Sequence, residues 1–212
     1  MSVAEIAEDR VIDVKSRPGK FAHVVIRTSR YDDMREFYKI LLGGRSAFAN
    51  DFLDFIRYDD EHHRVVIMNT ATAPSPAPGA TGMDHIAYTY GTLGELLGTY
   101  QRMKESGFFP VWSINHGLTT SIYYADPDGN MIETQVDNMD NDTADAFMRG
   151  PYFAVNPIGV DFDPDLLAER FLRGDPAEEL IKQGSAPWSR NAIPDAPPAL
   201  PDYDRFGDKL TG

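Results

Sequence analysis

Residues 20–70 show a strand pattern, then a helix pattern, then further strand patterns. The run 21–29 alternates in the manner of a strand. Between 31 and 44 apolar residues recur three and four positions apart, which predicts an amphipathic helix that buries Met34, Phe37, Tyr38, Leu41 and Leu42. Apolar runs at 51–59 and 63–70 predict two more strands, and we expect another around 45–50.

The same order of elements returns after a stretch rich in proline, alanine and glycine at 71–82. The run 83–90 has a strand pattern, and 92–107 has a helical pattern. Three further strands are predicted, at 109–116, 119–126 and 130–136. The chain therefore looks like an internal repeat of a β-α-β-β-β unit of about 60 residues.

Residues at the ends of the two predicted helices support these boundaries. Asp32 or Asp33 is placed to cap the start of the first helix, and Gly43 to end it. Thr92 and Glu95 have the spacing of a capping box at the start of the second helix.

A histidine stands third in the first strand of both units, and these two residues are His23 and His85. The shared position of the two histidines supports the internal repeat, and the repeated unit predicts an α+β fold. We expect the two βαβββ modules, joined by the linker at 71–82, to form one domain from the ranges 20–70 and 83–137.

The composition changes outside these modules. Residues 1–19 are polar and are expected to form an N-terminal arm. Residues 138–212 are acidic and rich in proline, with one helix predicted at 164–183. We interpret this C-terminal extension as a wrap over the core or an arm that reaches a second subunit, rather than a second domain.

The overall composition excludes several classes of function. The formal net charge is −13 and no lysine or arginine cluster stands out, which argues against nucleic acid and anionic membranes as partners. Cysteine is absent, so disulfides, thiolate metal sites and cysteine nucleophiles are excluded. No run of 18 apolar residues occurs and the N-terminus has no apolar signal core. We therefore expect a cytoplasmic protein.

The strand alternation places three candidate metal ligands on comparable faces. His23 shares a face with Val25 and Arg27, and His85 shares a face with Ala87 and Thr89. If two such sheets curl around one cavity, the two histidines face each other across it. In the last predicted strand, Glu133 lies on the opposite face from its apolar neighbour Ile132, and a carboxylate in a cavity is costly unless a cation pairs with it.

Two imidazoles and one carboxylate form the facial triad of non-haem Fe(II) sites, with open positions for a chelating substrate and dioxygen. The alternative is that each residue serves packing or solvation. An isolated histidine in a strand is more often a core or surface residue whose nitrogens are hydrogen-bonded. An isolated glutamate in a strand more often faces solvent. From the pattern alone a metal site is therefore a hypothesis.

A longer motif in the second module carries a resemblance to a known family. Ile114-Asn115-His116 is followed after five residues by Ile122-Tyr123, after two more by the turn Asp126-Pro127-Asp128-Gly129, and after three more by Glu133. This spacing resembles the pattern of the type I extradiol ring-cleaving dioxygenases of the vicinal oxygen chelate superfamily, which also includes glyoxalase I and bleomycin-resistance proteins. The chain is similar to a compact, single-domain form, the type III biphenyl-2,3-diol dioxygenases.

The resemblance implies a role for each matching residue. His23, His85 and Glu133 match the iron ligands, so the implied cofactor is Fe(II), with Mn(II) as an alternative on the same ligands. His63, in the segment Glu61-His62-His63, matches an active-site acid/base near the dioxygen position. The remaining matches are His116, for the histidine that hydrogen-bonds substrate or intermediate, and Tyr123, for the tyrosine that contacts a catechol hydroxyl.

The resemblance also implies a reaction and its partners. We expect a dioxygenase that inserts both atoms of O2 into a catechol-type aromatic diol with meta ring cleavage, in aromatic compound degradation, and that forms a homo-oligomer. Aromatic residues are candidates to line the substrate pocket, although each has packing as an alternative: Tyr88, Phe108, Phe109, Trp112, Tyr152, Phe153 and Trp188.

Three other functions stay open at this point. A glyoxalase-like metal isomerase uses the same fold with a fourth protein ligand near the end of the first module, where residues 65–69 offer no carboxylate. A small-molecule-binding protein like the bleomycin-resistance relatives needs no metal triad, so the three candidate ligands would have no purpose. An oxygenase for another diol, such as a hydroquinone, is the third.

Overall fold

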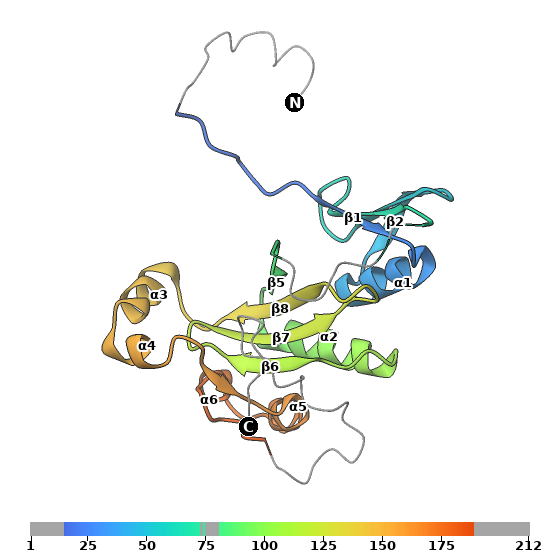
Figure 1. Cartoon of the computed structure of the whole chain (residues 1–212). Coiled ribbons are helices and arrows are strands. Elements are labelled where there is room, and N and C mark those ends of the chain that lie inside the picture. Colours follow the sequence, from blue (N-terminus) through green and yellow to red (C-terminus); the bar gives the residue numbers. More distant parts are fainter. Residues whose placement is uncertain (1–14, 73, 75–80, 189–212) are drawn as a thin grey trace.

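The computed structural model describes residues 15–72, 74 and 81–188, which form two β-sheets with helices packed against them (Figure 1). The predicted arm at 1–19 and linker at 71–82 lie partly outside these residues. Each sheet belongs to one βαβββ module, so the predicted α+β class and the repeated order of elements are confirmed.

The first module forms a four-stranded sheet in the order β1-β4-β3-β2. Its elements are β1 (Val24–Thr28), α1 (Tyr31–Leu42), β2 (Arg45–Ala49), β3 (Leu53–Arg57) and β4 (Val65–Asn69). The first and last strands, β1 and β4, pair in parallel, while the other neighbours are antiparallel. The strand expected around 45–50 is present as β2.

The second module repeats this arrangement in a five-stranded sheet with the order β5-β8-β7-β6-β9. Its elements are β5 (His85–Tyr90), α2 (Leu93–Glu105), β6 (Trp112–Asn115), β7 (Thr119–Ala125) and β8 (Met131–Asp137). Again the first and last strands of the module, β5 and β8, pair in parallel. The predicted capping box of Thr92 and Glu95 forms at the start of α2.

The predicted C-terminal end of α1 is confirmed, whereas its predicted N-terminal cap is not. Gly43 has a φ of 59° and ends the helix in the left-handed conformation, as predicted. The predicted cap by Asp32 or Asp33 is wrong, because the helix begins earlier, at Tyr31, and both carboxylates lie in its first turn. There they favour the helix through its dipole, and Asp33 accepts hydrogen bonds from Arg30.

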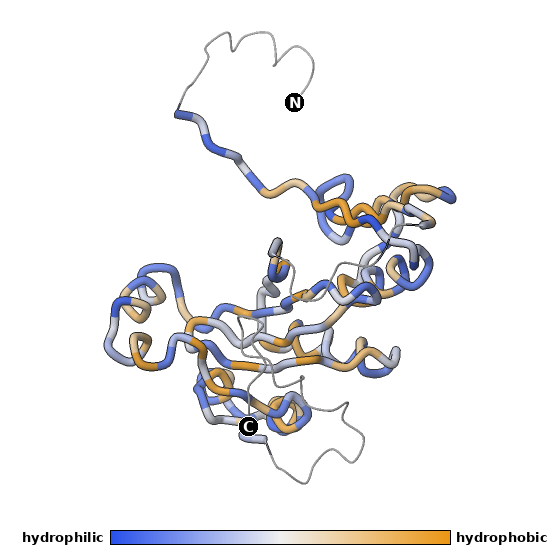
Figure 2. The backbone as a smooth tube through the Cα atoms, in the orientation of Figure 1, coloured by the Kyte–Doolittle hydropathy of each residue, from blue (hydrophilic) through white to orange (hydrophobic). Residues whose placement is uncertain are grey.

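Alternation along the first strand of each module separates a core face from an open face. In β1, Ile26 is buried, whereas Val25 and Arg27 are exposed. In β5, Ala87 and Thr89 are exposed, while the alternate residues pack against the core. Figure 2 shows that the strands of the first sheet are nonetheless largely hydrophobic.

Helices α1 and α2 join the two modules side by side through one continuous hydrophobic core (Figure 1). Arg102 of α2 donates hydrogen bonds to the carbonyls of Ile40 and Leu41 at the end of α1, at 2.7 and 3.1 Å. The hydroxyl of Tyr90 in β5 donates to the same Leu41 carbonyl at 3.1 Å. These contacts satisfy carbonyls that the end of α1 leaves unpaired, so they tie the second module to the first.

Asp126 organises the turn between β7 and β8. It is buried and accepts hydrogen bonds from the backbone and side chain of Asn130, both at 2.8 Å, and from the hydroxyl of Tyr38 in α1 at 3.0 Å. Burial raises the pKa of Asp126 although the hydrogen bonds act in the other direction. The turn fixes the register that sets Tyr123 opposite Glu133.

The C-terminal extension joins the second sheet and the shared core. It contains α3 (Asn141–Met148), α4 (Pro151–Val155), β9 (Val160–Asp161), α5 (Pro164–Leu172) and α6 (Ala177–Leu180). Strand β9 pairs with β6, and α5 packs on α2, where Tyr100 donates to Asp165 at 2.8 Å. The single helix predicted at 164–183 is wrong: Gly174, with a φ of 92°, and Pro176 separate α5 from α6.

Among the helices that the structure describes, none has the length and apolar character needed to cross a membrane.

Candidate metal centre and substrate site

Four residues form one row across the second sheet, one each from β5, β8, β7 and β6. The strand register pairs Ala87 with Glu133, Glu133 with Tyr123, and Tyr123 with Trp112. Directly paired residues point to the same face of a sheet. The predicted Glu133 and Tyr123 are therefore neighbours, and the ring of Trp112 lies beside that of Tyr123 with centroids 5.0 Å apart.

His85 and Glu133 meet on this face. His85 Nε2 lies 3.0 Å from Glu133 Oε2, and the Glu133 residue is only 5% exposed. On its other side, His85 Nδ1 lies 2.6 Å from Asp84 Oδ2. Both neighbours are carboxylates, which only accept, so Asp84 can hold a proton on Nδ1, while a metal bound by Nε2 and Glu133 would take the place of the proton between them. The pair thus presents one imidazole nitrogen and one carboxylate, both suited to a metal.

His116 and Tyr123 form a second pair beside Glu133. The hydroxyl of Tyr123 lies 3.1 Å from His116 Nε2, and the same nitrogen lies 4.0 Å from Glu133 Oε1. His116 Nδ1 donates to the carbonyl of Ile158, in the segment that leads to β9. A carbonyl only accepts, so neutral His116 carries its proton on Nδ1 and accepts from Tyr123 through Nε2.

The other two candidate histidines, His23 and His63, lie on the first sheet. Their ring centroids are 4.5 Å apart, and the ring of His63 also meets that of Phe55 edge-on at 4.9 Å. The pKa of His63 is lowered, chiefly by burial and further by the neighbouring imidazoles of His62 and His23. This environment favours the neutral ring, which is the form that accepts a proton.

The chemistry of these donors fits a two-histidine, one-carboxylate iron site, but one chain brings together only part of it. His85 and Glu133 are in contact, whereas His23 stands at the start of β1 on the other sheet. Within residues 15–72, 74 and 81–188, no group of three His, Asp or Glu side chains is arranged to hold a metal ion. The expectation that His23 and His85 face each other across one cavity stays a prediction, with His23 just before β1 of the first sheet and His85 in β5 of the second.

Several site contacts were not foreseen from the sequence. Asp84 supports His85 directly, and its adjacency in the chain was an available signal. Trp112 was expected only as a candidate pocket residue, and its Nε1 donates to Asp161 of β9 at 2.9 Å. The carbonyl of Ile158 left no signal in the sequence, because any residue supplies a carbonyl.

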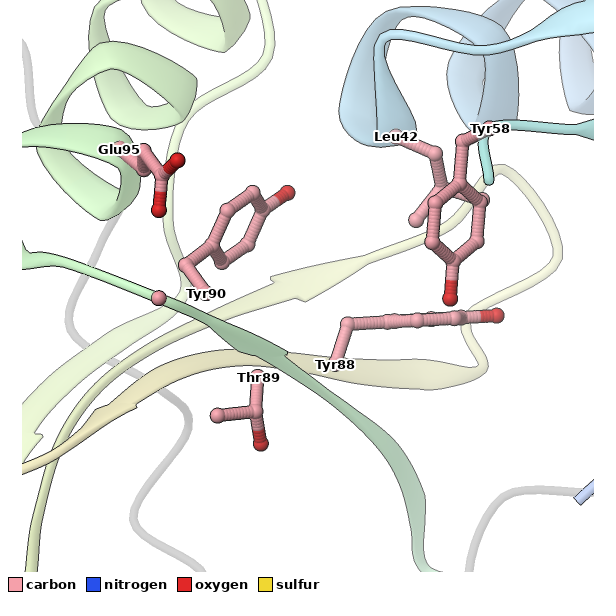
Figure 3. Close-up of a pocket in the computed structure, with 7 residues that line it drawn as sticks. Leu42, Tyr58, Tyr88, Thr89, Tyr90 and Glu95 are labelled. Atoms are coloured by element: carbon pink, nitrogen blue, oxygen red, sulfur yellow. The ribbon is translucent and has the colours of Figure 1, made fainter. Parts of the chain in front are cut away.

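The cleft drawn in Figure 3 is separate from these residues. It has a volume of about 240 Å3, and it lies where the two modules meet. Its lining comes from α1, β5, α2 and the end of β3: Leu42, Tyr58, Tyr88, Thr89, Tyr90, Gly91 and Glu95. None of the predicted metal ligands or catalytic residues lines this cleft, although Tyr88, an expected pocket residue, does and packs edge-on against Tyr58 there. The predicted metal ligands and catalytic residues therefore lie apart from this cleft.

Comparisons with known proteins show the family of the chain. The model of the Glyoxalase/Bleomycin resistance protein/Dioxygenase superfamily matches residues 20–134. Biphenyl-2,3-diol 1,2-dioxygenase 2 of Rhodococcus globerulus is 44% identical over 180 residues, which cover 84% of this chain and 93% of that protein. Biphenyl-2,3-diol 1,2-dioxygenase 3 of the same organism is 36% identical over 170 residues, which cover 79% of this chain and 90% of that protein.

Solved structures of low sequence identity also match. The crystal structure of lactoylglutathione lyase from Agrobacterium tumefaciens is 17% identical with a TM-score of 0.46, and the match covers 57% of this chain and 96% of that one.

Proposed function

The chain belongs to the Glyoxalase/Bleomycin resistance protein/Dioxygenase superfamily, and from this premise we propose a specific reaction for it. The chain is an extradiol dioxygenase of aromatic compound degradation, as its similarity to two biphenyl-2,3-diol 1,2-dioxygenases supports. It inserts both atoms of O2 into an aromatic diol and opens the ring beside the two hydroxyls. The observation in the structure that carries this function is the buried Glu133 against His85, with the hydrogen-bonded Tyr123 and His116 beside it.

The reaction balances without an external reductant. The O–O bond and the ring C–C bond next to the diol break, and one oxygen atom enters each new carbonyl end: one end becomes a carboxylate, and the other an aldehyde or, where that carbon carries a substituent, a ketone. The electrons that reduce O2 come from the diol, so the diol and O2 are the only substrates required. A hydroxymuconic-semialdehyde-type product follows for catechol.

The cofactor is a metal ion, and we assign Fe(II) to His23, His85 and Glu133. This set of two imidazoles and one carboxylate is typical of non-haem Fe(II), while Mn(II) suits the same donors. When bound, the metal would hold the diol and dioxygen next to each other and favour ionisation of the diol hydroxyls. Asp84 keeps the proton of His85 on Nδ1 and so leaves Nε2 for the metal.

Tyr123 and His116 act on the diol as a coupled pair. Tyr123 would orient a diol hydroxyl, while the Ile158 carbonyl holds the proton of His116 on Nδ1. In the first proton transfer, His116 Nε2 accepts a proton either from the hydroxyl of Tyr123 or from the diol by way of that hydroxyl. Only the protonated ring donates from Nε2, and the nearby carboxylate of Glu133 favours that charge. His116 therefore donates a hydrogen bond to a ring-opening intermediate only after it has taken up this proton.

His63 is the second proton-transfer residue. The pKa of its imidazole is lowered by burial, so the ring is neutral and ready to accept a proton from the diol. It returns that proton as an acid when the ring opens. Its contact with His23 places it next to a proposed metal ligand.

Two other functions fit these residues less well. A metal isomerase of the glyoxalase type would need a fourth ligand, and β4 offers only Val65, Val66, Ile67, Met68 and Asn69. A binding protein without a metal would leave no purpose for a buried carboxylate, Glu133, set against the imidazoles of His85 and His116.

Turnover with two diols tests the proposal. The chain is reconstituted anaerobically with Fe(II) and exposed to air with catechol and with 2,3-dihydroxybiphenyl, while a yellow product and oxygen uptake are recorded. We expect both signals in equal amounts, and their loss in Glu133→Ala. Yellow product and oxygen uptake that persist in Glu133→Ala would overturn the assignment of Glu133 as a metal ligand. A wild-type chain that binds no Fe(II) would overturn the proposal that it is an Fe(II) dioxygenase.

A further inference from the structure

We propose that Trp112, held in place by Asp161 of the C-terminal extension, sets the preference of the site for a diol with a second aromatic ring over unsubstituted catechol. This inference rests on the proposed function and names the residues that choose among diols. Its starting point is the position of the indole against Tyr123 and His116, the two residues assigned to the diol.

Trp112 lies in the same row of residues as the candidate site. Glu133, Tyr123 and Trp112 are directly paired across β8, β7 and β6, so their side chains leave the same face of the sheet. Neighbouring strands are about 4.8 Å apart. A diol that reaches from the proposed metal ligand Glu133 to the hydroxyl of Tyr123 therefore ends one strand away from Trp112.

The indole of Trp112 forms one aromatic surface with its two neighbours. Its ring centroid lies 5.0 Å from that of Tyr123, with the two planes 31° apart. It lies 5.9 Å from the centroid of His116 and meets that ring edge-on. Aromatic rings attract each other at such distances beyond the effect of the area that they bury. Trp112 is half-buried, so part of its surface stays accessible to a ligand.

A short strand of the C-terminal extension fixes this indole. Trp112 Nε1 donates to Asp161 Oδ1 at 2.9 Å, and the register of β9 and β6 pairs Asp161 with Ile114. Ile114 and Trp112 are two positions apart in β6, so their side chains leave the same face of the sheet as that of Asp161. The carboxylate can therefore reach the indole, and a hydrogen bond to a charged acceptor favours one orientation of the ring.

The same segment of the extension also supports His116. The carbonyl of Ile158 accepts from His116 Nδ1, three residues before Asp161. Residues 158–161 thus contact two of the rings that surround the proposed diol position. The extension therefore helps to shape the substrate site, although it lies outside the two modules.

The order of residues in the row favours a diol with a second ring. Tyr123 is assigned to one diol hydroxyl, and the carbon next to a hydroxyl carries hydrogen in catechol but a phenyl ring in 2,3-dihydroxybiphenyl. Trp112 follows Tyr123 in the row, so a substituent at this carbon lies beside the indole. The indole offers that substituent an apolar, planar surface, and burial of aromatic surface favours binding.

Turnover of two diols by a Trp112 variant tests the proposal. Wild type and Trp112→Leu are loaded with Fe(II), and kcat/KM is measured for 2,3-dihydroxybiphenyl and for catechol. We expect Trp112→Leu to lower kcat/KM for 2,3-dihydroxybiphenyl about 10-fold, because a contact between two aromatic rings is lost. The value for catechol should change less than about 2-fold, because catechol has no ring beside the indole.

A double-mutant cycle tests the part of Asp161. Asp161→Ala removes the acceptor and should lower the preference for 2,3-dihydroxybiphenyl about 3-fold, which is typical of one hydrogen bond. Asp161→Asn retains an acceptor oxygen and should restore the preference. Trp112→Phe has no N–H group, so the addition of Asp161→Ala to it should change nothing further. An equal effect of Asp161→Ala in both backgrounds would overturn the assignment of Asp161.

Tryptophan emission gives a readout that does not depend on turnover. The sequence has two tryptophans, Trp112 and Trp188, so Trp188→Phe leaves Trp112 as the only one. Its emission is recorded without oxygen while each diol is added to the Fe(II)-loaded variant, with correction for absorption by the diol. We expect a larger change at saturation with 2,3-dihydroxybiphenyl than with catechol. Equal changes would contradict contact between the second ring and the indole.

The outcomes separate this inference from the proposed function. Equal losses for both diols in Trp112→Leu would overturn the inference, because Trp112 would then only support Tyr123, and an unchanged preference would also overturn it. A wild-type chain that cleaves neither diol would instead overturn the proposed function, and this inference with it. Circular dichroism and Fe(II) content verify each variant, and Trp112→Phe with Asp161→Ala keeps the test possible if Trp112→Leu fails to fold.

Discussion

Glu133 is held on the second sheet with His85 Nε2 3.0 Å from one of its oxygens and the ring of Tyr123 on the neighbouring strand. Burial of a carboxylate is unfavourable unless a cation or hydrogen-bond donors offset the loss of hydration. The motif around residues 114–133 identified Glu133, His116 and Tyr123 in the sequence because the turn fixes their register. Contacts made by backbone atoms, such as the Ile158 carbonyl on His116, could not be found there.

Asp84 is expected to tune metal affinity through His85. Asp84→Asn weakens the acceptor that holds the proton on His85 Nδ1, and loss of such a partner lowers metal affinity about 10-fold to 100-fold. Asp137→Asn removes the same charge from the same sheet without touching His85 and should leave the affinity near wild type. Titration of both variants with Fe(II) under anaerobic conditions measures the difference. Equal affinities in the two would rule out this role for Asp84.

His63 is expected to act in proton transfer and not in metal binding. His63→Ala should retain the wild-type Fe(II) content and lose about 100-fold to 10,000-fold in kcat, the usual range for a general acid or base. Asp60→Ala is the control, because Asp60 is an exposed residue of the same loop with no assigned role. Loss of iron in His63→Ala would contradict the assignment.

At the scale of elements, the sequence predicted the order of the strands and helices correctly. It predicted the ends of these elements, and the structure of the C-terminal extension, only in part. Apolar spacing identified α1 and α2 because each buries one face against a sheet. The helix predicted at 164–183 failed because the apolar pattern continues on both sides of Gly174 and Pro176, which interrupt the backbone. Strand β9 was missed because two residues are too short to show alternation.

Gly159 connects the extension to the catalytic strand β6. It has a φ of 117°, and a Cβ at this position would overlap the carbonyl oxygen of Asn115 and the backbone of His116. Gly159→Ala should therefore push β9 and the Ile158 carbonyl away from His116 and lower both stability and kcat. The control Gly184→Ala also replaces a glycine of positive φ but meets no atom within 4 Å, so it should cost only about 1–2 kcal/mol of backbone strain.

Unfolding in urea and steady-state turnover separate the two effects. Gly159→Ala with the stability and kcat of the Gly184 variant would show that β9 does not support His116.

Asp54 is expected to make the stability of the first module depend on pH. Burial acts to raise the pKa of Asp54, but hydrogen bonds from Arg35 at 2.7 Å, Lys39 at 2.9 Å and Ser46 at 3.0 Å outweigh it and lower the pKa. A carboxyl whose pKa is lower in the folded state stabilises the fold above its unfolded pKa, which is about 3.9. This contribution is lost as pH falls below that value, through the folded pKa.

Asp54→Asn should therefore lower the free energy of unfolding by about 1–3 kcal/mol at pH 7, with a smaller difference from wild type below about pH 4. Urea unfolding at pH 7, 4 and 3 measures this difference. A gap that stays constant over this range would show that the charge of Asp54 does not contribute.

At the scale of the whole molecule, the sequence predicted both modules but not their relative placement. Strand alternation predicted the open face of β1, which carries Val25 and Arg27, and that of β5, which carries His85; His23 lies just before β1. How two sheets are placed depends on the helices between them, and the bonds of Arg102 and Tyr90 to the end of α1 carry no sequence motif. The expectation of one cavity lined by both histidines therefore stays a prediction.

The most direct test of the central claim is oxygen labelling of the product. The wild-type chain is loaded with Fe(II), supplied with 2,3-dihydroxybiphenyl under 18O2, and the ring-opened product is analysed by mass spectrometry after a short reaction. The account predicts two labelled oxygen atoms per product molecule, because both atoms of O2 enter the new carbonyl ends. A product with one label from O2 and one oxygen from water, or an unopened ring, would contradict it.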